Sequence, residues 1–442
     1  MKPITRRRLI AATLSAFVLA ALAVAIQPIA IAGQPQGQWW RGNTHTHTRW
    51  SDGVDFPEIV AEKYKAAGYN FLVHADHNIL MSGTRWSVIK AGQESRIEEY
   101  RKRFPDVRLP EKEEKQDDKE KKVVAAVKMV QPRALADWRS LYEEPGRFIL
   151  IQGEEITGRG GRPLVHMVAL PITEVIEPQK GPTVRDQIAG DLAAVMKQAS
   201  AAGRQSVAIL CHPNWGGVLP VEEFAPIGEL RFFEVTNGVI TDADNTGDAD
   251  RLSTDRLWDV VMTRRVEAGL PPIFGVSSDD VHDTRSGTAR GWVMVRAPAL
   301  KEEAIVAAML AGDFYSTNGV RLKDIRREGR DIVVEIDPEQ GVTYRTQFIG
   351  TLPGYDRSKE DAKDDKGKLL PPTQRYSADI GKVLAEVEGT TAKYTPKGDE
   401  LYVRAKVVST KAVQNPNSKK DPAAKDGFET AWTQPFVISA PK

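Results

Sequence analysis

The feature that most constrains the fold is where histidines and acidic residues stand relative to short hydrophobic runs. Four such runs, each about the length of a buried strand, end just before one or two of these residues. The run at residues 71–73 precedes Asp76 and His77, the run at 148–151 precedes Glu154, the run at 207–210 precedes His212, and the run at 273–276 precedes Asp280 and His282. In an α/β barrel the chemistry collects at the C-terminal ends of the strands. The pattern therefore predicts an α/β fold in which these side chains converge on one mouth.

The stretch 43–53 adds a second signal. His45 and His47 are two residues apart, so on an extended chain both imidazoles point to the same side and can share one metal ion. Asp52 begins an Asp-Gly turn that returns a carboxylate towards them. Alone, the stretch is equally well explained as a polar strand end followed by a turn. His166 differs, because it lies at the start of its hydrophobic run, 164–170. Its strand is expected to run the other way, unless the barrel is distorted.

The order of these motifs resembles the PHP (polymerase and histidinol phosphatase) superfamily of metallohydrolases, over about residues 40–318. The matching motifs are H-x-H with S-D-G, D-H-N, G-E-E, a lone His, H-P and D-x-H. The resemblance implies a distorted seven-stranded (β/α) barrel and a site with up to three metal ions. It implies that Glu154 bridges two ions. The full implied ligand set is His45, His47, Glu154 and Asp280 for one ion, Glu154, His166 and His212 for a second, and Asp52, His77 and His282 for a third.

Imidazole and carboxylate ligands without thiolate suit Zn, Mn or Fe, so two to three divalent transition-metal ions are expected. Asp76 is expected to orient His77 through a hydrogen bond, although direct ligation by Asp76 stays open, and Glu155 and Asp279 are expected to support other ligands in the same way. Two residues near the motifs receive a structural interpretation. His74 matches no family position and is expected to pack within its strand, and Cys211 is expected to be a small buried strand residue.

Three features leave two interpretations open. The glycine-rich turn 157–163 carries Arg159 and Arg162, which either grip an anion at the mouth or are solvated. Asn237 either lines the mouth or belongs to a turn. The acidic stretch 242–250 partly resembles a calcium loop, but Ser253 stands where the bidentate Glu belongs, so a loop that caps the next helix is favoured.

Clustered metal ions activate a bridging water and neutralise charge on phosphoryl oxygens, so the favoured function is hydrolysis of a small-molecule phosphate ester. Glu154, Arg159 and Arg162 are the residues expected to take part beside the metal. One alternative is a carboxyl-ester or carbamate hydrolase on the same metal core, and Trp50, Trp86 and Trp215 leave room for it. Another is a non-catalytic metal-dependent binding protein. The formal net charge of +1 argues against nucleic acid as the partner.

Residues 1–32 have the pattern of a signal peptide, with Arg6 and Arg7 before an apolar run at 9–26. A twin-arginine export signal is favoured over an ordinary Sec signal. The protein is therefore expected to be exported, periplasmic or secreted, without stable membrane insertion unless the uncleaved segment 9–26 anchors it.

The remaining chain divides into residues 33–319, the metallohydrolase barrel, and residues 320–442, expected to form a small antiparallel β-sandwich that caps it. A charged insertion interrupts the barrel at about residues 82–146. Within it, 111–122 is expected to be a solvated helix or a disordered excursion, with a lid over the site as the alternative, and 133–144 is expected to be a helix. The charged stretches 356–374 and 414–427 are expected to be long exposed loops.

Overall fold

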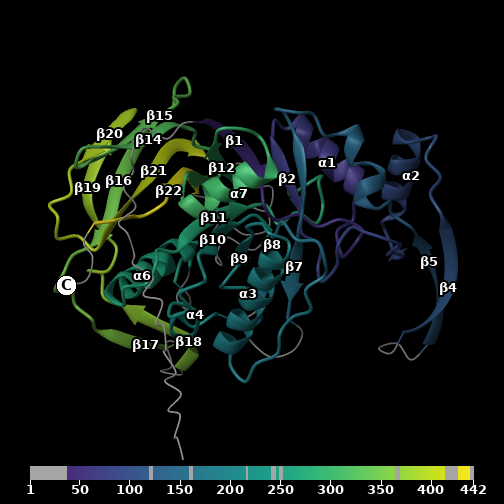
Figure 1. Cartoon of the computed structure of the whole chain (residues 1–442), viewed down its shortest axis with the longest axis horizontal. Coiled ribbons are helices and arrows are strands. Elements are labelled where there is room, and N and C mark those ends of the chain that lie inside the picture. Colours follow the sequence, from purple (N-terminus) through teal and green to yellow (C-terminus); the bar gives the residue numbers. More distant parts are fainter. Residues whose placement is uncertain are drawn as a thin grey trace, which may run out of the picture. The chain divides into compact units, whose positions relative to one another are not determined.

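The fold is described from a computed structural model of the chain (Figure 1). The structure describes residues 37–118, 123–158, 163–215, 218–239, 245–247, 252–363, 369–413 and 427–438. These residues belong to one compact unit, Pro35–Lys442. The expected signal segment, residues 1–32, lies outside the described part. Within the described part, no helix is both long and apolar enough to cross a membrane.

Two sheets supply the strand ends that the sequence predicts. In the first, β1 (Gln38–Asn43), β2 (Phe71–His74) and β6 (Ile149–Gln152) run parallel. The helix α1 (Pro57–Ala66) connects β1 to β2. Pro57 fits its first turn, where the missing N–H has no intrahelical partner, and Gly68 follows its end with a φ of 79°. The expected β-α-β step is therefore present.

The second sheet has the order β11-β10-β9-β8-β7. Its strands are β7 (Glu154–Thr157), β8 (His166–Leu170), β9 (Val207–Leu210), β10 (Phe232–Asn237) and β11 (Phe274–Ser278). β8 runs antiparallel to both of its neighbours, while β9, β10 and β11 run parallel. The start of β8 therefore lies at the edge where the other strands end, and His166 faces the same mouth as they do. This confirms the reversed strand inferred from the position of His166.

Isolated bridges join the two sheets at this mouth, one between Thr46 and Val281 and one between His77 and Glu155. Helices follow the strands along the chain: α3 (Val184–Ala201), α4 (Val221–Phe224), α6 (Thr254–Glu267) and α7 (Glu302–Ala311). The α3 helix begins with the expected capping box, in which Thr183 and Asp186 satisfy each other's backbone N–H groups. The described part is thus a mixed α/β structure.

Apolar side chains from both sheets form a shared core beneath the mouth. Its members include Phe71, Val73, Ile209, Val276 and Val293, none more than 1% exposed. Burial of each such side chain stabilises the fold by roughly 1.5–3 kcal/mol. The packing holds the strand ends in fixed positions, which a multi-residue metal site requires.

The charged insertion is built differently from the prediction. It contains β3 (Ser87–Val88), α2 (Glu94–Arg103), and a hairpin of β4 (Glu111–Asp118) with β5 (Val123–Val130). The helix or excursion predicted for 111–122 is therefore wrong for the described residues 111–118. Pairing along the whole of β5, which is rich in valine, outweighs the low strand propensity of the charged partner. The helix predicted for 133–144 is only two short 3₁₀ turns, Leu135–Asp137 and Arg139–Leu141.

The C-terminal region is antiparallel, as predicted, but its main sheet is continuous with the first sheet of the site. β12 (Trp292–Ala297) pairs with β1, β13 (Phe314–Thr317) pairs with β12, and β22 (Phe428–Thr433) pairs with β13. The same sheet continues through β21 (Tyr402–Ala412), β16 (Tyr344–Thr351) and β19 (Lys382–Glu388), with β23 (Phe436–Val437) beside β21. A smaller sheet packs on it and comprises β14 (Leu322–Glu328), β15 (Asp331–Ile336) and β20 (Thr391–Tyr394).

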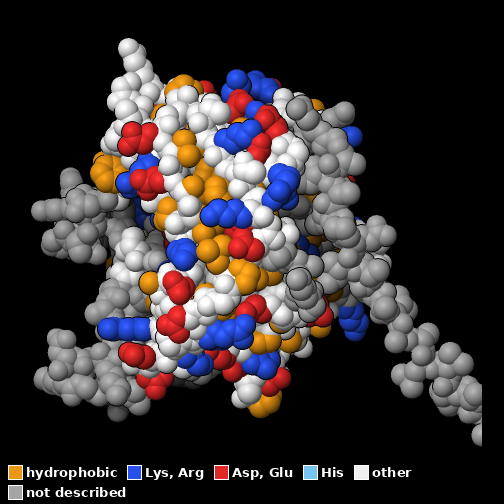
Figure 2. Space-filling model, turned by 90° about the vertical axis from the view of Figure 1, so that its left-hand side faces the viewer, with side chains coloured by type: hydrophobic (Ala, Val, Ile, Leu, Met, Phe, Trp, Pro, Cys, Tyr) orange, Lys and Arg blue, Asp and Glu red, His pale blue; other side chains and the backbone are white. Residues whose placement is uncertain are grey.

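The stretch 356–374, predicted as an exposed loop, contains most of a second hairpin, β17 (Lys359–Lys363) with β18 (Leu369–Tyr376). The other predicted loop, 414–427, lies outside the described residues except for Gly427. Figure 2 shows one face of the molecule, where hydrophobic side chains form a central strip flanked by both Lys or Arg and Asp or Glu. The mixture of signs agrees with the near-neutral net charge.

Candidate metal centre

The loop after β1 places the first two histidines. The side-chain oxygen of Asn43 accepts a hydrogen bond from the backbone N–H of His45 at 3.1 Å. Thr46 donates its hydroxyl to the carbonyl of Val73, and the N–H of His47 donates to the carbonyl of Val281 at 2.9 Å. These bonds fix the backbone between two strand ends, so both imidazoles are held on one side. Their Nε2 atoms lie 3.1 Å apart.

Glu155 lies at the centre of the histidine cluster. Its Oε1 is 2.9 Å from His166 Nδ1, 3.4 Å from His212 Nε2 and 3.6 Å from His45 Nε2. Its Oε2 is 2.5 Å from His77 Nδ1 and 3.5 Å from His47 Nε2. One carboxylate thus meets five imidazoles. Burial opposes ionisation of Glu155, but His45 and His77 hold its pKa well below the ordinary value.

The prediction that Glu154 bridges the metal ions is corrected by this geometry. Side chains alternate along a strand, so neighbours in β7 point to opposite faces. Glu155 points into the cluster, whereas Glu154 accepts a hydrogen bond from the N–H of Ile176 at 2.9 Å. Burial raises the pKa of Glu154 to about 8. Glu155 therefore occupies the position assigned to Glu154.

Asp280 and Asp52 close the cluster on two sides. Asp280 Oδ1 lies 3.0 Å from His47 Nε2 and 3.4 Å from His45 Nε2. Asp52 is 3.4 Å from His282 Nε2 and 3.6 Å from His77 Nε2. Burial opposes ionisation of Asp52, yet its contacts with His282 and His77 hold its pKa below the ordinary value. The Asp52 side chain is 44% exposed, so this side of the cluster faces solvent.

The donor set fits transition-metal ions. Glu155 Oε2 and Asp280 Oδ1 are buried and make no hydrogen bond. Burial disfavours protonation of His45, but nearby acidic groups, Asp280 foremost, raise its pKa well above the ordinary value. For His47, burial and the neighbouring His282 lower the pKa. Buried imidazoles crowded against buried carboxylate oxygens, without well-formed hydrogen bonds at these two oxygens, are the arrangement that bound cations would relieve. Among the residues that the structure describes, four groups have ligand atoms within 4.8 Å of one another: His47, Asp52, His77 and His282; His45, Cys211 and Glu234; His45, His47 and Glu155; and His77, Glu155 and His166.

The structure therefore brings together eight of the nine predicted ligands. These are His45, His47, Asp52, His77, His166, His212, Asp280 and His282, joined by Glu155. His74 lies apart, buried against Trp138 with no hydrogen bond at either ring nitrogen, and burial lowers its pKa to about 4. The two arginines of the glycine-rich turn, Arg159 and Arg162, lie outside the described residues.

Glu234 is a functional candidate that the sequence analysis missed. It is buried, and its Oε1 accepts from His45 Nδ1 at 2.8 Å and from the hydroxyl of Ser278 at 2.6 Å. Its Oε2 accepts from the N–H of His212 at 2.8 Å. Glu234 thereby orients two predicted ligands from one strand. The signal was available, because a carboxylate within the apolar run 232–235 is costly unless it is paired.

Two further polar residues support the centre. The side-chain amide of Asn237 donates hydrogen bonds to Glu234 at 2.8 Å and to Asp280 Oδ2 at 3.0 Å. These contacts support the interpretation that Asn237 lines the mouth. Thr157 lies 2.6 Å from His77 Nδ1. Cys211 is buried beside His45 and Glu234, and burial raises the pKa of its thiol well above the ordinary value. A protonated thiol agrees with the small buried strand residue that was expected.

Two acidic residues take roles other than those expected. Asp76 accepts hydrogen bonds from both the N–H and the hydroxyl of Thr48, at 2.8 and 2.9 Å, and from both donors of Ser51. It therefore orders the turn that carries Asp52 instead of orienting His77. Asp279 accepts from the hydroxyl of Tyr64 and from backbone N–H groups of 289–291. It shapes the loop beside Asp280.

An exposed aromatic ring lies at the far side of the cluster from Asp52. The ring centroid of Trp215 is 5.1 Å from that of His212 and 5.7 Å from that of His166. Trp215 is 42% exposed, which is unusual for so large an apolar side chain. It offers a surface for the organic part of a substrate next to the Glu155 group.

No family model matches this chain, and no curated protein matches it. Among solved structures, it is similar to a two-domain protein of Bacteroides vulgatus described as containing a predicted PHP-like metal-dependent phosphoesterase. The identity is 13%, the match covers 92% of this chain and 97% of that one, and the TM-score is 0.38.

Two shorter proteins are matched over about half of this chain. One, from Bifidobacterium adolescentis, is described as a candidate metal-dependent phosphoesterase, with 16% identity, coverage of 56% and 89%, and a TM-score of 0.26. The other, from Chromobacterium violaceum, is described as an amidohydrolase with bound sulfate and no metal, with 15% identity, coverage of 55% and 87%, and a TM-score of 0.26. Of these three solved structures, the Bacteroides vulgatus protein is described as PHP-like, the superfamily that the motifs of this chain resemble.

Proposed function

We propose that this protein is a metal-dependent hydrolase that cleaves phosphate esters. The observation that carries the proposal is the cluster around Glu155, where one buried carboxylate meets five imidazoles. A structural metal site needs four ligands and is closed. This cluster has more ligands than one ion can use, and Asp52 and His282 leave one side open. The arrangement supports a multinuclear, catalytic centre.

The proposed ligand sets follow the groups in the structure. His45, His47, Glu155 and Asp280 would hold one ion, Glu155, His166 and His212 a second, and Asp52, His77 and His282 a third. Zn, Mn or Fe suit these donors. When bound, such ions lower the pKa of a coordinated water and neutralise charge on phosphoryl oxygens.

The protein's own residues hold the centre rigid. Glu234 and Asn237 orient His45, His212 and Asp280 through the hydrogen bonds described above. Asp76 keeps the Asp52 turn in place. Arg159 and Arg162 remain proposed partners of the phosphoryl oxygens, since a bidentate guanidinium matches their geometry. Pre-positioned groups of this kind stabilise developing charge without reorganisation during the reaction.

Trp215 favours a second candidate, a carboxyl-ester or carbamate hydrolase on the same metal core. Its exposed ring would receive an uncharged organic group beside His166 and His212. The test is one preparation, stripped and reloaded with Zn²⁺, Mn²⁺ or Fe²⁺, assayed against phosphomonoesters, phosphodiesters, carbamates and aryl esters. We expect phosphate esters to have the highest kcat/KM. A carbamate turned over faster than every phosphate ester would replace the first candidate by the second.

The architecture and the location belong to the same proposal. The two bridged sheets would form the distorted (β/α) barrel of the PHP type, and residues 1–32 would direct export through the twin-arginine route. A reporter fused after the signal segment would be exported with Arg6 and Arg7 intact. Export that continues unchanged after both are replaced by Lys would rule out that route and leave Sec.

A further inference from the structure

A surface pocket opens beside the exposed side of the candidate metal centre. It has a volume of about 200 Å³ and lies between the turn that carries Asp52 and the first part of the charged insertion. Its lining residues are Arg49, Ser51, Asp52, Gly53, Arg85, Trp86, Ser87, Val88, Lys90 and Gln93. Asp52 belongs to both, so the pocket adjoins the candidate metal centre.

The pocket carries uncompensated positive charge. The side chain of Arg49 is 1% exposed and donates only to neutral acceptors, Gln93 Oε1 at 2.9 Å, Ser87 Oγ at 3.4 Å and the carbonyl of Val88 at 3.4 Å. Its Nε makes no hydrogen bond. Arg85 and Lys90 are exposed, and neither forms an ion pair with any residue that the structure describes.

The nearby carboxylates neutralise these cations only in part, since Asp55 acts on Arg49 electrostatically but forms its ion pair with another arginine. Asp55 accepts from Arg96 at 2.8 Å and from the hydroxyl of Thr284 at 2.7 Å. Asp52, the one carboxylate among the lining residues, is held by His77 and His282. A buried guanidinium without a carboxylate partner is costly, unless a ligand supplies the negative charge.

Trp86 adds an aromatic wall, and Lys112, which is ion-paired with Glu114, lies over it. The Lys112 Nζ lies 4.5 Å from the centre of the Trp86 ring. The pocket therefore combines several cationic groups with one flat apolar surface. This suits a short organic chain or ring that ends in an acidic group.

We propose that this pocket binds an acidic group on the leaving alcohol, so that the preferred substrate is a phosphate ester with a second negative charge, a carboxylate or another phosphate. The inference rests on the proposed phosphoesterase function and names its substrate class. Hydrolysis breaks the ester P–O bond, the water oxygen becomes bonded to phosphorus, and a proton passes to the leaving alcohol. Arg49, Arg85 and Lys90 are the groups that determine specificity.

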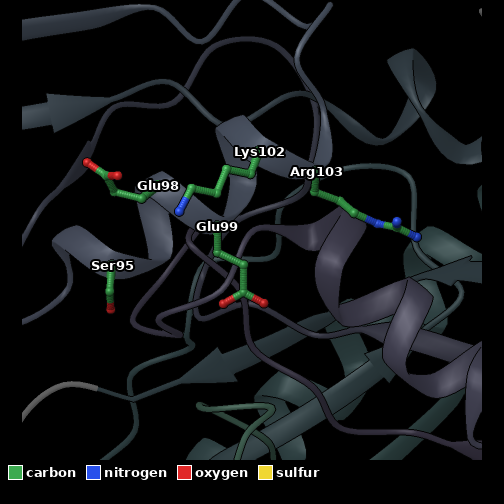
Figure 3. Close-up of a pocket in the computed structure, with 5 residues that line it drawn as sticks. All are labelled: Ser95, Glu98, Glu99, Lys102 and Arg103. Atoms are coloured by element: carbon green, nitrogen blue, oxygen red, sulfur yellow. The ribbon is translucent and has the colours of Figure 1, made fainter.

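Another hollow of the described surface lacks this character. It has a volume of about 560 Å³ and is lined by Ser95, Glu98, Glu99, Lys102 and Arg103, whose side chains all leave the helix α2 (Figure 3). Arg103 is paired with Glu62, and Glu99 with Arg285 at 2.6 Å. Mixed, mutually paired charges on one helix face do not indicate a bound ligand. Lys102 supplies a matched control, an exposed cation of the same insertion outside the proposed pocket.

The experiment measures binding without turnover. Metal-loaded protein is titrated calorimetrically with ω-carboxyalkylphosphonates of two to four methylenes, with the corresponding alkyl diphosphonates, and with alkylphosphonates of equal length. These probes cannot be hydrolysed, so the result does not depend on catalysis. The variants are Arg85→Ala with Lys90→Ala, and Lys102→Ala. Both pocket substitutions are at exposed positions, where folding is little affected.

We expect at least one acidic probe length to bind about tenfold more tightly than the alkylphosphonate of equal length, which lacks the second acidic group, since two or three charged contacts of modest strength add to this factor. The double variant should lose most of that preference and bind alkylphosphonates as before, whereas Lys102→Ala should keep it. A preference for the diphosphonate alone would identify phosphate, and one for the carboxylate would identify a carboxylic acid. No preference at any length, or a preference that survives the double substitution, overturns the inference. Absence of phosphoesterase turnover in the separate substrate panel would instead overturn the proposed function.

Discussion

The contrast between the neighbouring residues Glu155 and Glu154 gives the sharpest test of the metal centre. We expect Glu155→Gln to disable metal binding and Glu154→Gln to leave it nearly intact. Glu155 meets five imidazoles, whereas Glu154 points to the other face of β7 and accepts one backbone N–H from Ile176. The two substitutions are chemically identical and one residue apart, so each controls for the other.

The expected magnitudes follow from the contacts. Removing a residue that merely orients a ligand costs 10–100-fold in metal affinity. Loss of the central carboxylate should reach or exceed the upper end of that range, about 100-fold or about 2.8 kcal/mol. Burial raises the pKa of Glu154 to about 8, so at pH 7 a neutral amide would replace a mostly neutral acid. The Ile176 hydrogen bond can be kept by the amide oxygen, and we expect a change below about threefold.

The assay is competition between the metal-free protein and a chromophoric chelator for Zn²⁺ at pH 7, followed by elemental analysis of the reloaded protein. Circular dichroism of each variant checks that the fold is retained. Equal losses of affinity in both variants would show that the two residues contribute alike. Wild-type affinity in Glu155→Gln would remove this residue from the centre altogether, and with it the proposed bridging role.

Four further predictions concern the stability of the fold and the residues in and around the candidate metal centre. Burial raises the pKa of Asp191 to about 7, so the wild type should lose stability as pH rises from about 4 to 7, and Asp191→Asn should be more stable above that window by up to about 4 kcal/mol in urea unfolding. Glu234→Gln should lower Zn²⁺ affinity by roughly 10–100-fold with unchanged circular dichroism, because it weakens the hold on His45. Arg404 is buried and paired with acidic residues of α6, so Arg404→Ala should lower the free energy of unfolding by about 3–5 kcal/mol in the same assay. An effect no larger than that of a surface ion pair would contradict its role in joining β21 to α6. His74→Ala should keep the full metal content by elemental analysis while lowering the unfolding midpoint, unlike His45→Ala, since His74 packs against Trp138 away from the cluster.

Local sequence was enough to pick out most of the residues that the structure brings together in the candidate metal centre. Strand-length apolar runs ending in His, Asp or Glu are a direct consequence of burying strands and exposing their ends, so they are visible without a structure. The direction of β8 was also inferable, because His166 stands at the start of its run and not at the end. Sequence spacing predicted these features because each depends on residues that are neighbours along the chain.

The choice between Glu154 and Glu155 needed the tertiary structure. Either residue can face the mouth, since shifting a strand by one position exchanges its two faces, and only the packing of β7 against β8 sets which face is inward. Glu234 was missed for a related reason, because its partners His45 and His212 are far away in sequence and meet it only through the fold. The charged strand β4 was predicted as helix or excursion because its own residues have low strand propensity, and pairing with β5 decided its conformation. The sequence by itself therefore determined which residue types gather at the strand ends, whereas strand register and long-range pairing decided which atoms meet.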